Sequence, residues 1–181
     1  WDFYTNFLNK HFKNHHFTRF PHKHDFFLVI LFTKGIGKHE VDFETYKVER
    51  GALFVLKPGQ MHYWELSNDA DGFVFFHSRE FFDKGFISLS IKDFHFHNSF
   101  QGTPYFKLEE KQLNELEFLM SELVTEHENN DFLKWQKIHS LIVLVYIEIG
   151  RYNNPLGNIK NHTYLAKFRQ FEDLIEENFR R

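Results

Sequence analysis

Three histidines stand at positions where their side chains could act together. His22 and His24 are two residues apart, and residues two apart in a β-strand point to the same face. A third, His62, follows a Pro-Gly turn and opens another predicted strand. Imidazole is a common metal ligand and titrates near neutral pH, so three converging rings would suit zinc or another borderline divalent ion. The alternative is that they form hydrogen bonds with backbone groups or with a bound small molecule.

The elements that must position these rings are short strands. From residue 21 to residue 106, apolar runs alternate with turn residues, a pattern typical of an antiparallel sandwich or barrel. We expect strands at 26–32, 39–43, 46–48, 52–56, 61–66, 73–77, 94–97 and 105–106, and a short helical turn at 79–83. In the 94–97 strand, Phe94 and Phe96 should face inward, with His95 and His97 in solvent. The predicted fold class is mainly β, a barrel of about eight strands followed by C-terminal helices.

After residue 107 the apolar period changes from two to 3.6, which predicts helices. The first is expected over 109–128 and the second over 132–152, with a third from Tyr164 to Phe179. The second helix is apolar on more than one side, so both of its faces must be covered. Because one small barrel covers only one face, we expect the other to form a dimer interface. The candidate interface residues are Trp135, Ile138, Leu141, Ile142, Leu144 and Val145.

Composition excludes several classes of function. The 181 residues carry 22 Lys+Arg against 25 Asp+Glu, a net charge of −3, so general electrostatic binding of nucleic acid is not expected. There is no Cys, which excludes disulfides, thiolate zinc sites and a Cys nucleophile. The longest apolar run, residues 141–147, is far shorter than the ~18–20 residues of a membrane span. We therefore expect a soluble, cytoplasmic protein.

The spacing of the histidines resembles a known pair of motifs. His22-Lys23-His24 together with Pro58-Gly59-Gln60-Met61-His62 resembles the two cupin motifs, whose histidines meet inside a barrel. The wider pattern is similar to the effector-binding domain of AraC-family transcription regulators, with the Gly35-Ile36-Gly37 turn and the apolar run 53–56 before the second motif. The resemblance implies a cupin-like (double-stranded β-helix, or jelly-roll) barrel with an N-terminal arm over 1–107. It also implies an α-helical dimerisation and linker region over 108–181.

One departure from the cupin pattern bears on chemistry. Metal-dependent cupin enzymes usually add a carboxylate shortly after the His-x-His pair on the same strand. Here Asp25 has the wrong parity, and the apolar residues 26–30 cannot coordinate a metal. We therefore expect a barrel that binds a guest molecule, with no enzymatic activity and no obligatory cofactor. A divalent metal such as zinc at His22, His24 and His62 stays open as an alternative.

The resemblance also implies which residues contact the effector. Strand parity places Phe26, Leu28, Ile30, Gln60 and Trp64 on the same inner face as His24 and His62. In AraC-like regulators, the position two after the second-motif histidine and alternate positions of the next strand contact the effector. The predicted ligand-binding residues are thus His22, His24, Phe26, His62, Trp64, Asp71, Phe73 and Phe75. An aromatic face with a few polar groups suits a sugar or another small polar ligand with apolar faces, unless the aromatic residues are simply core.

These features together predict the ligand-sensing and dimerisation part of an AraC-type transcription regulator. Resembling regulators bind DNA through two helix-turn-helix units in a separate C-terminal domain, which we expect to lie beyond this chain because residues 168–175 resemble the helix leading into it. Residues 1–20 are expected either to fold over the ligand as a lid or to pack as a surface appendage. Two rivals stay open: a metal-dependent cupin isomerase or dioxygenase, and a stand-alone sugar-binding cupin.

Overall fold

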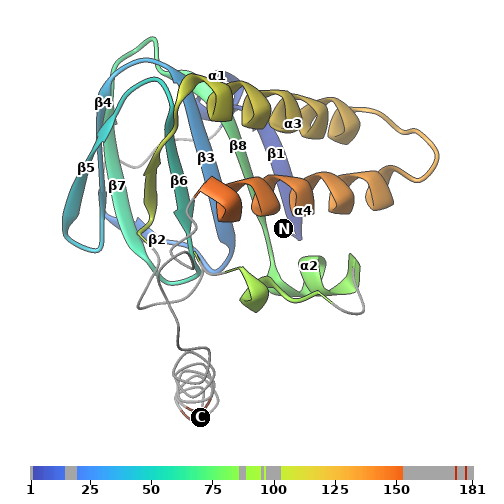
Figure 1. The fold of residues 1–181 in the computed structure, drawn as a ribbon. Coiled ribbons are helices and arrows are strands. Elements are labelled where there is room, and N and C mark those ends of the chain that lie inside the picture. Colours follow the sequence, from blue (N-terminus) through green and yellow to red (C-terminus); the bar gives the residue numbers. More distant parts are fainter. Residues whose placement is uncertain are drawn as a thin grey trace.

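The computed structural model describes residues 2–14, 20–85, 89–94, 96, 103–152, 174 and 178. In chain order the elements are β1 (Phe3–Phe7), α1 (Leu8–Asn14), β2 (His22–Lys23), β3 (Phe27–Lys34), β4 (Gly37–Val41), β5 (Glu44–Val48), β6 (Ala52–Leu56), β7 (Met61–Leu66), β8 (Asp71–His77), α2 (Arg79–Gly85), η1 (Ile91–Asp93), β9 (Tyr105–Lys107), α3 (Glu110–Glu128) and α4 (Lys134–Tyr152). The two sheets and the helices beside them are shown in Figure 1. None of the described helices is long and apolar enough to cross a membrane.

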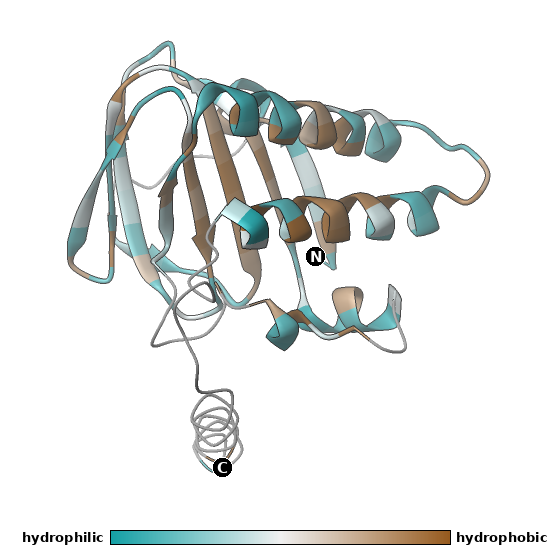
Figure 2. Ribbon diagram, viewed as in Figure 1, coloured by the Kyte–Doolittle hydropathy of each residue, from teal (hydrophilic) through white to brown (hydrophobic). Residues whose placement is uncertain are grey.

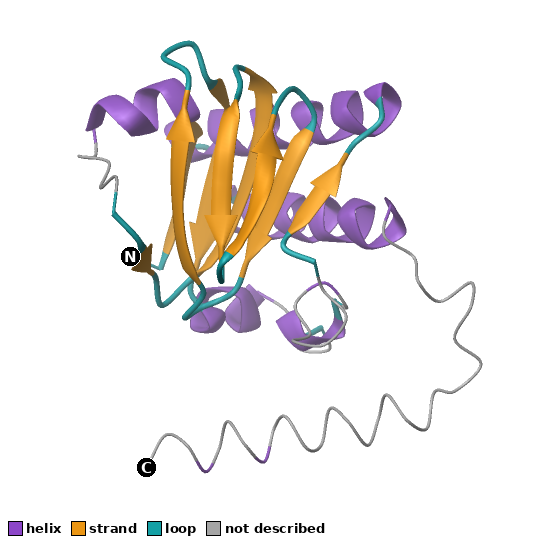
Figure 3. Cartoon of the chain, turned by 90° about the vertical axis from the view of Figure 1, so that its left-hand side faces the viewer, coloured by secondary structure: helices purple, strands orange, loops and turns teal. Residues whose placement is uncertain are grey.

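The strands form two antiparallel sheets. One has five strands in the order β1-β8-β3-β6-β9, and the other has four in the order β2-β7-β4-β5. Strand β1 lies at one edge of the five-stranded sheet and pairs with β8 from Phe3 opposite His77 to Phe7 opposite Phe73. Figure 3 shows the strands grouped in front of the helices. Two antiparallel sheets followed by the helices α3 and α4 confirm the predicted mainly β fold class with C-terminal helices.

Apolar side chains from both sheets meet between them. We call this group the interior cluster: Tyr4, Leu8, Leu28, Ile30, Phe32, Val41, Val48, Ala52, Phe54, Leu56, Trp64 and Val74. Alternate residues of β3 and β6 face it, as strand periodicity requires. Tyr4 and Leu8 come from the N-terminal segment, which forms β1 and α1 and is therefore part of the sheet and its core.

The outer face of the five-stranded sheet is covered by helices. The other residues of the same strands, including Val29, Leu31, Leu53 and Val55, pack with α2, α3 and α4 in a second cluster, which we call the helix-facing cluster. Figure 2 shows hydrophobic residues concentrated on the central strands of this sheet and hydrophilic ones on the outer sides of the helices. Since both faces of these strands are buried, their sequences are apolar without alternation.

The start of the first long strand differs from the prediction. His22 and Lys23 do not continue into β3; they form the short strand β2, which pairs with β7 in the four-stranded sheet. The chain bends at Asp25 and Phe26 and enters β3 in the other sheet. This change of sheet places His22 directly opposite His62.

Most of the residues predicted for a dimer interface are instead buried within this chain. Ile138, Leu141, Ile142 and Val145 belong to the helix-facing cluster and are at most 7% exposed. The prediction was wrong for these four because α4 packs on the five-stranded sheet together with α3 and α2, so more of its circumference is covered than a barrel alone would cover. Trp135 and Leu144 remain 48% and 44% exposed.

The predicted strand over 94–97 is also not observed in the described residues. The 3₁₀ helix η1 precedes Phe94, with Ser90 and Asp93 capping each other's backbone N–H groups. This local capping satisfies the backbone groups that a strand would have to pair with a neighbour. Phe94 and Phe96 are buried, as predicted, against the helices. His95, His97 and most of the predicted third helix lie outside the described residues.

Candidate functional site

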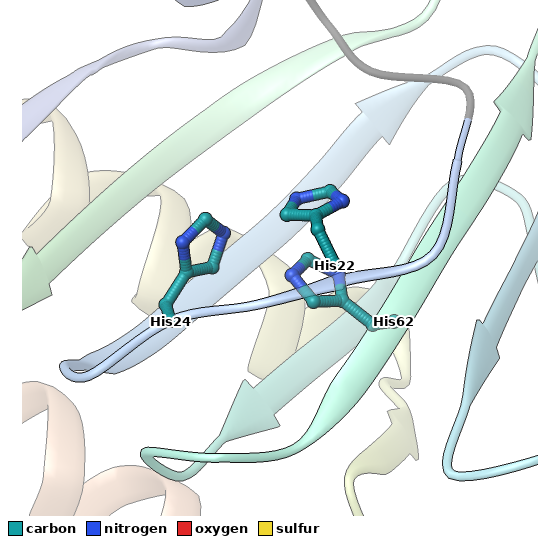
Figure 4. A group of neighbouring side chains, drawn as sticks. All are labelled: His22, His24 and His62. Carbon is teal, nitrogen blue, oxygen red and sulfur yellow. The ribbon is translucent and has the colours of Figure 1, made fainter.

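His22, His24 and His62 come together at one end of the space between the sheets (Figure 4). The ring centroids of His22 and His62 are 4.5 Å apart, those of His22 and His24 are 4.8 Å apart, and those of His24 and His62 are 5.2 Å apart. One nitrogen from each ring lies within 4.8 Å of the others. His62 is buried, whereas His22 and His24 are half-buried. The group therefore reaches from the interior toward solvent.

Two of these rings form a hydrogen bond with a residue outside the three-histidine group. The Nδ1 atom of His22 lies 3.0 Å from the carbonyl oxygen of Phe20. Because a carbonyl only accepts, His22 carries a proton on Nδ1 and donates it to Phe20. The Nδ1 atom of His62 lies 3.0 Å from Nε2 of a fourth histidine, His39 on β4. Each contact orients a ring that belongs to the three-histidine group.

Two buried imidazole nitrogens at this site have no hydrogen-bond partner among the residues that the structure describes. They are Nδ1 of His39 and Nε2 of His62, and the two side chains are 0% and 1% exposed. Leaving a buried polar atom unpaired costs about 1–3 kcal/mol, so natural proteins rarely do so without a reason. These atoms therefore point to a ligand, an ion or a water as their partner.

Burial lowers the pKa of three histidines at this site, His24, His39 and His62. Burial lowers the pKa of His62 to about 3, with further lowering by the neighbouring His22 and His24. Burial also lowers the pKa of His24, aided by His22, and holds the pKa of His39 well below its usual value. Near neutral pH the His24, His39 and His62 rings are thus uncharged. Neutral imidazole is the form that accepts hydrogen bonds and binds metal ions.

Aromatic side chains surround the polar group. Phe26 stacks on His24 with a centroid distance of 4.4 Å and on Phe76 at 4.2 Å. Trp64, 6% exposed, lies 4.7 Å from the His39 ring and 5.3 Å from the His62 ring. Phe26 and Trp64 therefore face the interior as predicted, and so do Leu28 and Ile30.

The N-terminal helix α1 contributes to the same interior. Leu8 is fully buried in the interior cluster, and the Phe12 ring lies 6.3 Å from that of Trp64. Residues 3–14 thus cover part of the space between the sheets, which is the position that a lid would need. A lid function for this segment stays a prediction.

Four residues predicted to face the effector do not lie in the interior. Phe73 and Phe75 on β8 belong to the helix-facing cluster, and Val74 and Phe76 take the inner positions. The register of β8 against β3, in which Val74 pairs with Ile30, sets this parity. The sequence could not reveal it because four consecutive apolar residues of β8 show no alternation.

The other two residues are held in turns and at strand ends. Asp71, at the start of β8, accepts hydrogen bonds from the backbone N–H and the side-chain amide of Asn9 at 3.1 and 2.9 Å. It therefore anchors the start of α1 and does not contact the histidines. Gln60 lies in the turn before β7. Its side-chain oxygen accepts a hydrogen bond from the backbone N–H of Lys57, and its side-chain NH₂ group donates one to the carboxylate of Asp42.

His39 is the site residue that the sequence reasoning missed. It lies opposite Trp64 in the β4–β7 register, and Val41, two residues later, lies opposite His62. The predicted strand over 39–43 already placed His39 on the same face as the apolar Val41, which indicated that His39 could face the interior. What the sequence did not show was which strand would pair with β7.

The three-histidine group meets several requirements of a metal site. Three imidazoles suit zinc. Tetrahedral zinc with Zn–N distances of ~2.0–2.1 Å holds its ligand atoms about 3.4 Å apart. Small rotations of the three rings would bring their nitrogens to that separation. The unpartnered Nε2 of His62 points to the same conclusion. Among the described residues, this group of potential ligands contains no carboxylate, in line with the departure from the cupin enzyme pattern.

Comparison with known proteins shows a similar fold and a partial match to one family model. No curated protein sequence matches this chain. Among solved structures, the AraC-like transcriptional activator CuxR has a TM-score of 0.50 and 13% identity over 71% of this chain and 42% of its own. An apo variant of ToxT from Vibrio cholerae has a TM-score of 0.48 and 15% identity over 84% of this chain and 58% of its own.

KdgF from Halomonas sp. has 24% identity and a TM-score of 0.31 over 33% of this chain and 56% of its own. The chain thus spans less than two thirds of each of these structures. The likeness to CuxR, at this identity, shows the fold alone. The family model of the AraC-like ligand binding domain matches 6–79, a range that contains all four histidines of the site. Over residues 6–79 this chain is therefore similar to the AraC-like ligand binding domain.

Proposed function

We propose that this chain is the ligand-sensing domain of an AraC-type transcription regulator, working in the cytoplasm without enzymatic activity. A small molecule would bind between the two sheets, beside His22, His24 and His62. The observation that carries this proposal is the pair of buried, unpartnered nitrogens on His39 and His62, in a domain of a ligand-binding family. A ligand hydroxyl or similar polar group would complete their hydrogen bonds and remove their desolvation cost.

The proposed effector has apolar faces and a few polar groups, and a sugar is the first class to test. Trp64 and Phe26 offer flat apolar surfaces beside the imidazoles. Neutral imidazoles can donate to or accept from hydroxyl groups without requiring a charged ligand. Ligand sites of this kind combine an apolar lining with a small number of placed polar groups.

Binding would affect transcription by shifting an equilibrium between two arrangements of the domain. A ligand can shift such an equilibrium only by its difference in affinity for the two states. Strand β8 lies between the interior cluster and the helix-facing cluster, so movement of its inner side chains can reach α4. In a homodimer, Trp135 and Leu144 are the exposed large apolar residues of α4 available for contact with the partner. DNA would be bound by two helix-turn-helix units in a separate domain.

Heteronuclear NMR with a panel of monosaccharides tests the sensing proposal. We expect shifts at the Trp64 indole and at the His24 and His62 rings on titration with at least one sugar. His62→Ala should weaken binding of that sugar, whereas His77→Gln, a change at a buried histidine on the other face of the sheet, should not. Identical shifts in wild-type protein and His62→Ala would contradict an effector site at these histidines.

A second candidate function is binding of a divalent metal ion by His22, His24 and His62, favoured by the distances among their nitrogens. When bound, such an ion would supply a positive centre that attracts an oxygen of the effector. Elemental analysis of purified protein tests this candidate: one equivalent of zinc, lost in His62→Ala, would support it. A cupin isomerase or dioxygenase would show the same metal and would in addition turn over a small polar substrate.

A further inference from the structure

His39 is a fourth histidine placed behind the three. It comes from β4, is 0% exposed, and is packed between the rings of Phe54 at 4.4 Å and Trp64 at 4.7 Å. Its Nε2 atom is 3.0 Å from Nδ1 of His62, and it does not belong to the group of three potential ligands. A leucine would fill this apolar position without an unpaired polar atom, so packing does not explain a histidine here.

We propose that His39 is a positioning residue that fixes His62 for binding a divalent ion, an inference that rests on the proposed metal candidate. In this arrangement Nε2 of His39 accepts a hydrogen bond from the Nδ1–H of His62. The proton on Nδ1 leaves the lone pair on Nε2 of His62 directed to the group formed with His22 and His24. Such outer contacts orient the ligand ring, fix its tautomer and raise its basicity.

The other tautomer of His62 would prevent this ring from binding a metal ion through Nε2. If Nε2 of His39 donated instead, His62 would carry its proton on Nε2 and could not offer a lone pair to the group. His22 supplies an independent comparison, because its Nδ1 contacts the carbonyl oxygen of Phe20 and must donate. His62 in the proposed tautomer therefore matches His22, since both rings carry a proton on Nδ1.

The environment of His39 suits this role. The rings of Phe54 and Trp64 restrict the rotation of the His39 ring, which keeps its Nε2 directed at His62. Its own Nδ1 stays without a partner among the described residues. The charged and titratable groups near the pair are the other imidazoles, His22 and His24.

Cobalt and zinc titrations of the whole chain test the role of His39. Cobalt binding is followed by visible absorption, and zinc binding by competition with a chelating dye. We expect His39→Leu to weaken metal binding roughly 10–100-fold, the usual effect of losing such an outer contact. His39→Gln, whose side-chain oxygen can accept from His62, should restore most of the affinity. His77→Gln is the matched control and should bind like wild type, because His77 lies on the other face of the sheet.

Long-range ¹H–¹⁵N spectra of the zinc-bound wild-type protein give a second readout that needs no variant to fold. We expect a protonated Nδ1 and a zinc-shifted Nε2 on His62. Coordination through Nδ1, or unchanged affinity in His39→Leu, would overturn the role of His39. If wild-type protein takes up neither metal, the metal candidate and this inference fall together, while the sugar titration still decides the sensing proposal.

Discussion

The buried contact between His77 and Tyr146 predicts a specific loss of stability in acid. His77 is 0% exposed, its Nδ1–H donates to the carbonyl oxygen of Ser78 at 2.8 Å, and its Nε2 accepts from the Tyr146 hydroxyl at 2.6 Å. Both nitrogens therefore have a partner in the neutral ring. Burial lowers the pKa of His77 to about 4. The perturbation we propose is His77→Gln, which keeps an acceptor for Tyr146 but cannot titrate in this range.

The sign and size of the effect follow from proton linkage. In the unfolded chain the pKa of His77 returns to about 6.5, so the unfolded state binds a proton first as the pH falls. The stability due to neutral His77 is complete above about pH 6.5 and is lost progressively down to its folded pKa of about 4. One pKa unit corresponds to about 1.4 kcal/mol, so lowering the pH from about 7 to about 5 should remove about 2 kcal/mol through this residue.

Urea unfolding of wild type and His77→Gln at both pH values measures this contribution. His39 and His62 also destabilise the folded state in acid, but they do so in both proteins, and the comparison isolates His77. We expect wild type to lose about 2 kcal/mol more than His77→Gln between the two pH values. Equal losses in the two proteins would refute the assignment of a buried, neutral His77.

Three further predictions concern stability and assembly. Ile142→Glu should unfold or precipitate the protein, with a loss of about 4 kcal/mol or more, because a charge replaces a fully buried side chain. Leu144 is 44% exposed, so Leu144→Glu should leave the thermal stability of the protein unchanged. If α4 forms the dimer interface, light scattering of Leu144→Glu should show a monomer. Gly72→Ala should lower the free energy of unfolding by more than about 1 kcal/mol. Gly72 has φ of +151°, and an added Cβ would overlap a backbone oxygen of β3. A urea midpoint equal to that of wild type would contradict this prediction. Lys137→Met should lower the free energy of unfolding, because it removes the partner, 2.7 Å away, of the 3% exposed Glu126, whereas replacing the exposed Lys111 should have no measurable effect.

Much of the fold could be predicted because local signals and the final structure agree. The turn Lys57-Pro58-Gly59 separates two strands, 52–56 and 61–66, whose predicted and observed limits coincide. The change to a 3.6-residue period after residue 107 likewise predicted α3 within one residue of its observed start. The pairing of His-x-His with a later Pro-Gly-x-x-His predicted the meeting of three imidazoles that the structure shows.

The remaining features depend on contacts that single-sequence patterns do not encode. The parity of β8 is set by its register with β3, and both faces of β8 are apolar, so no periodicity marked Phe73 and Phe75 as helix-facing. The part of α4 that remains exposed depends on where α3 and α2 pack, which the apolar stripe of α4 does not reveal. His39 entered the site through the β4–β7 pairing, a long-range contact of the same kind.

The edge position of β1 has a practical consequence for handling the protein. Neighbouring residues of this strand pack on opposite faces of the sheet. The Phe3 ring stacks on Phe81 beside the helices, whereas the Tyr4 ring stacks on Phe76 between the sheets. Deleting residues 2–7 would therefore loosen both layers and expose the backbone of β8 from Phe73 to His77. An exposed apolar strand edge pairs readily with strands of other molecules, so truncated preparations should aggregate or exchange strands between molecules.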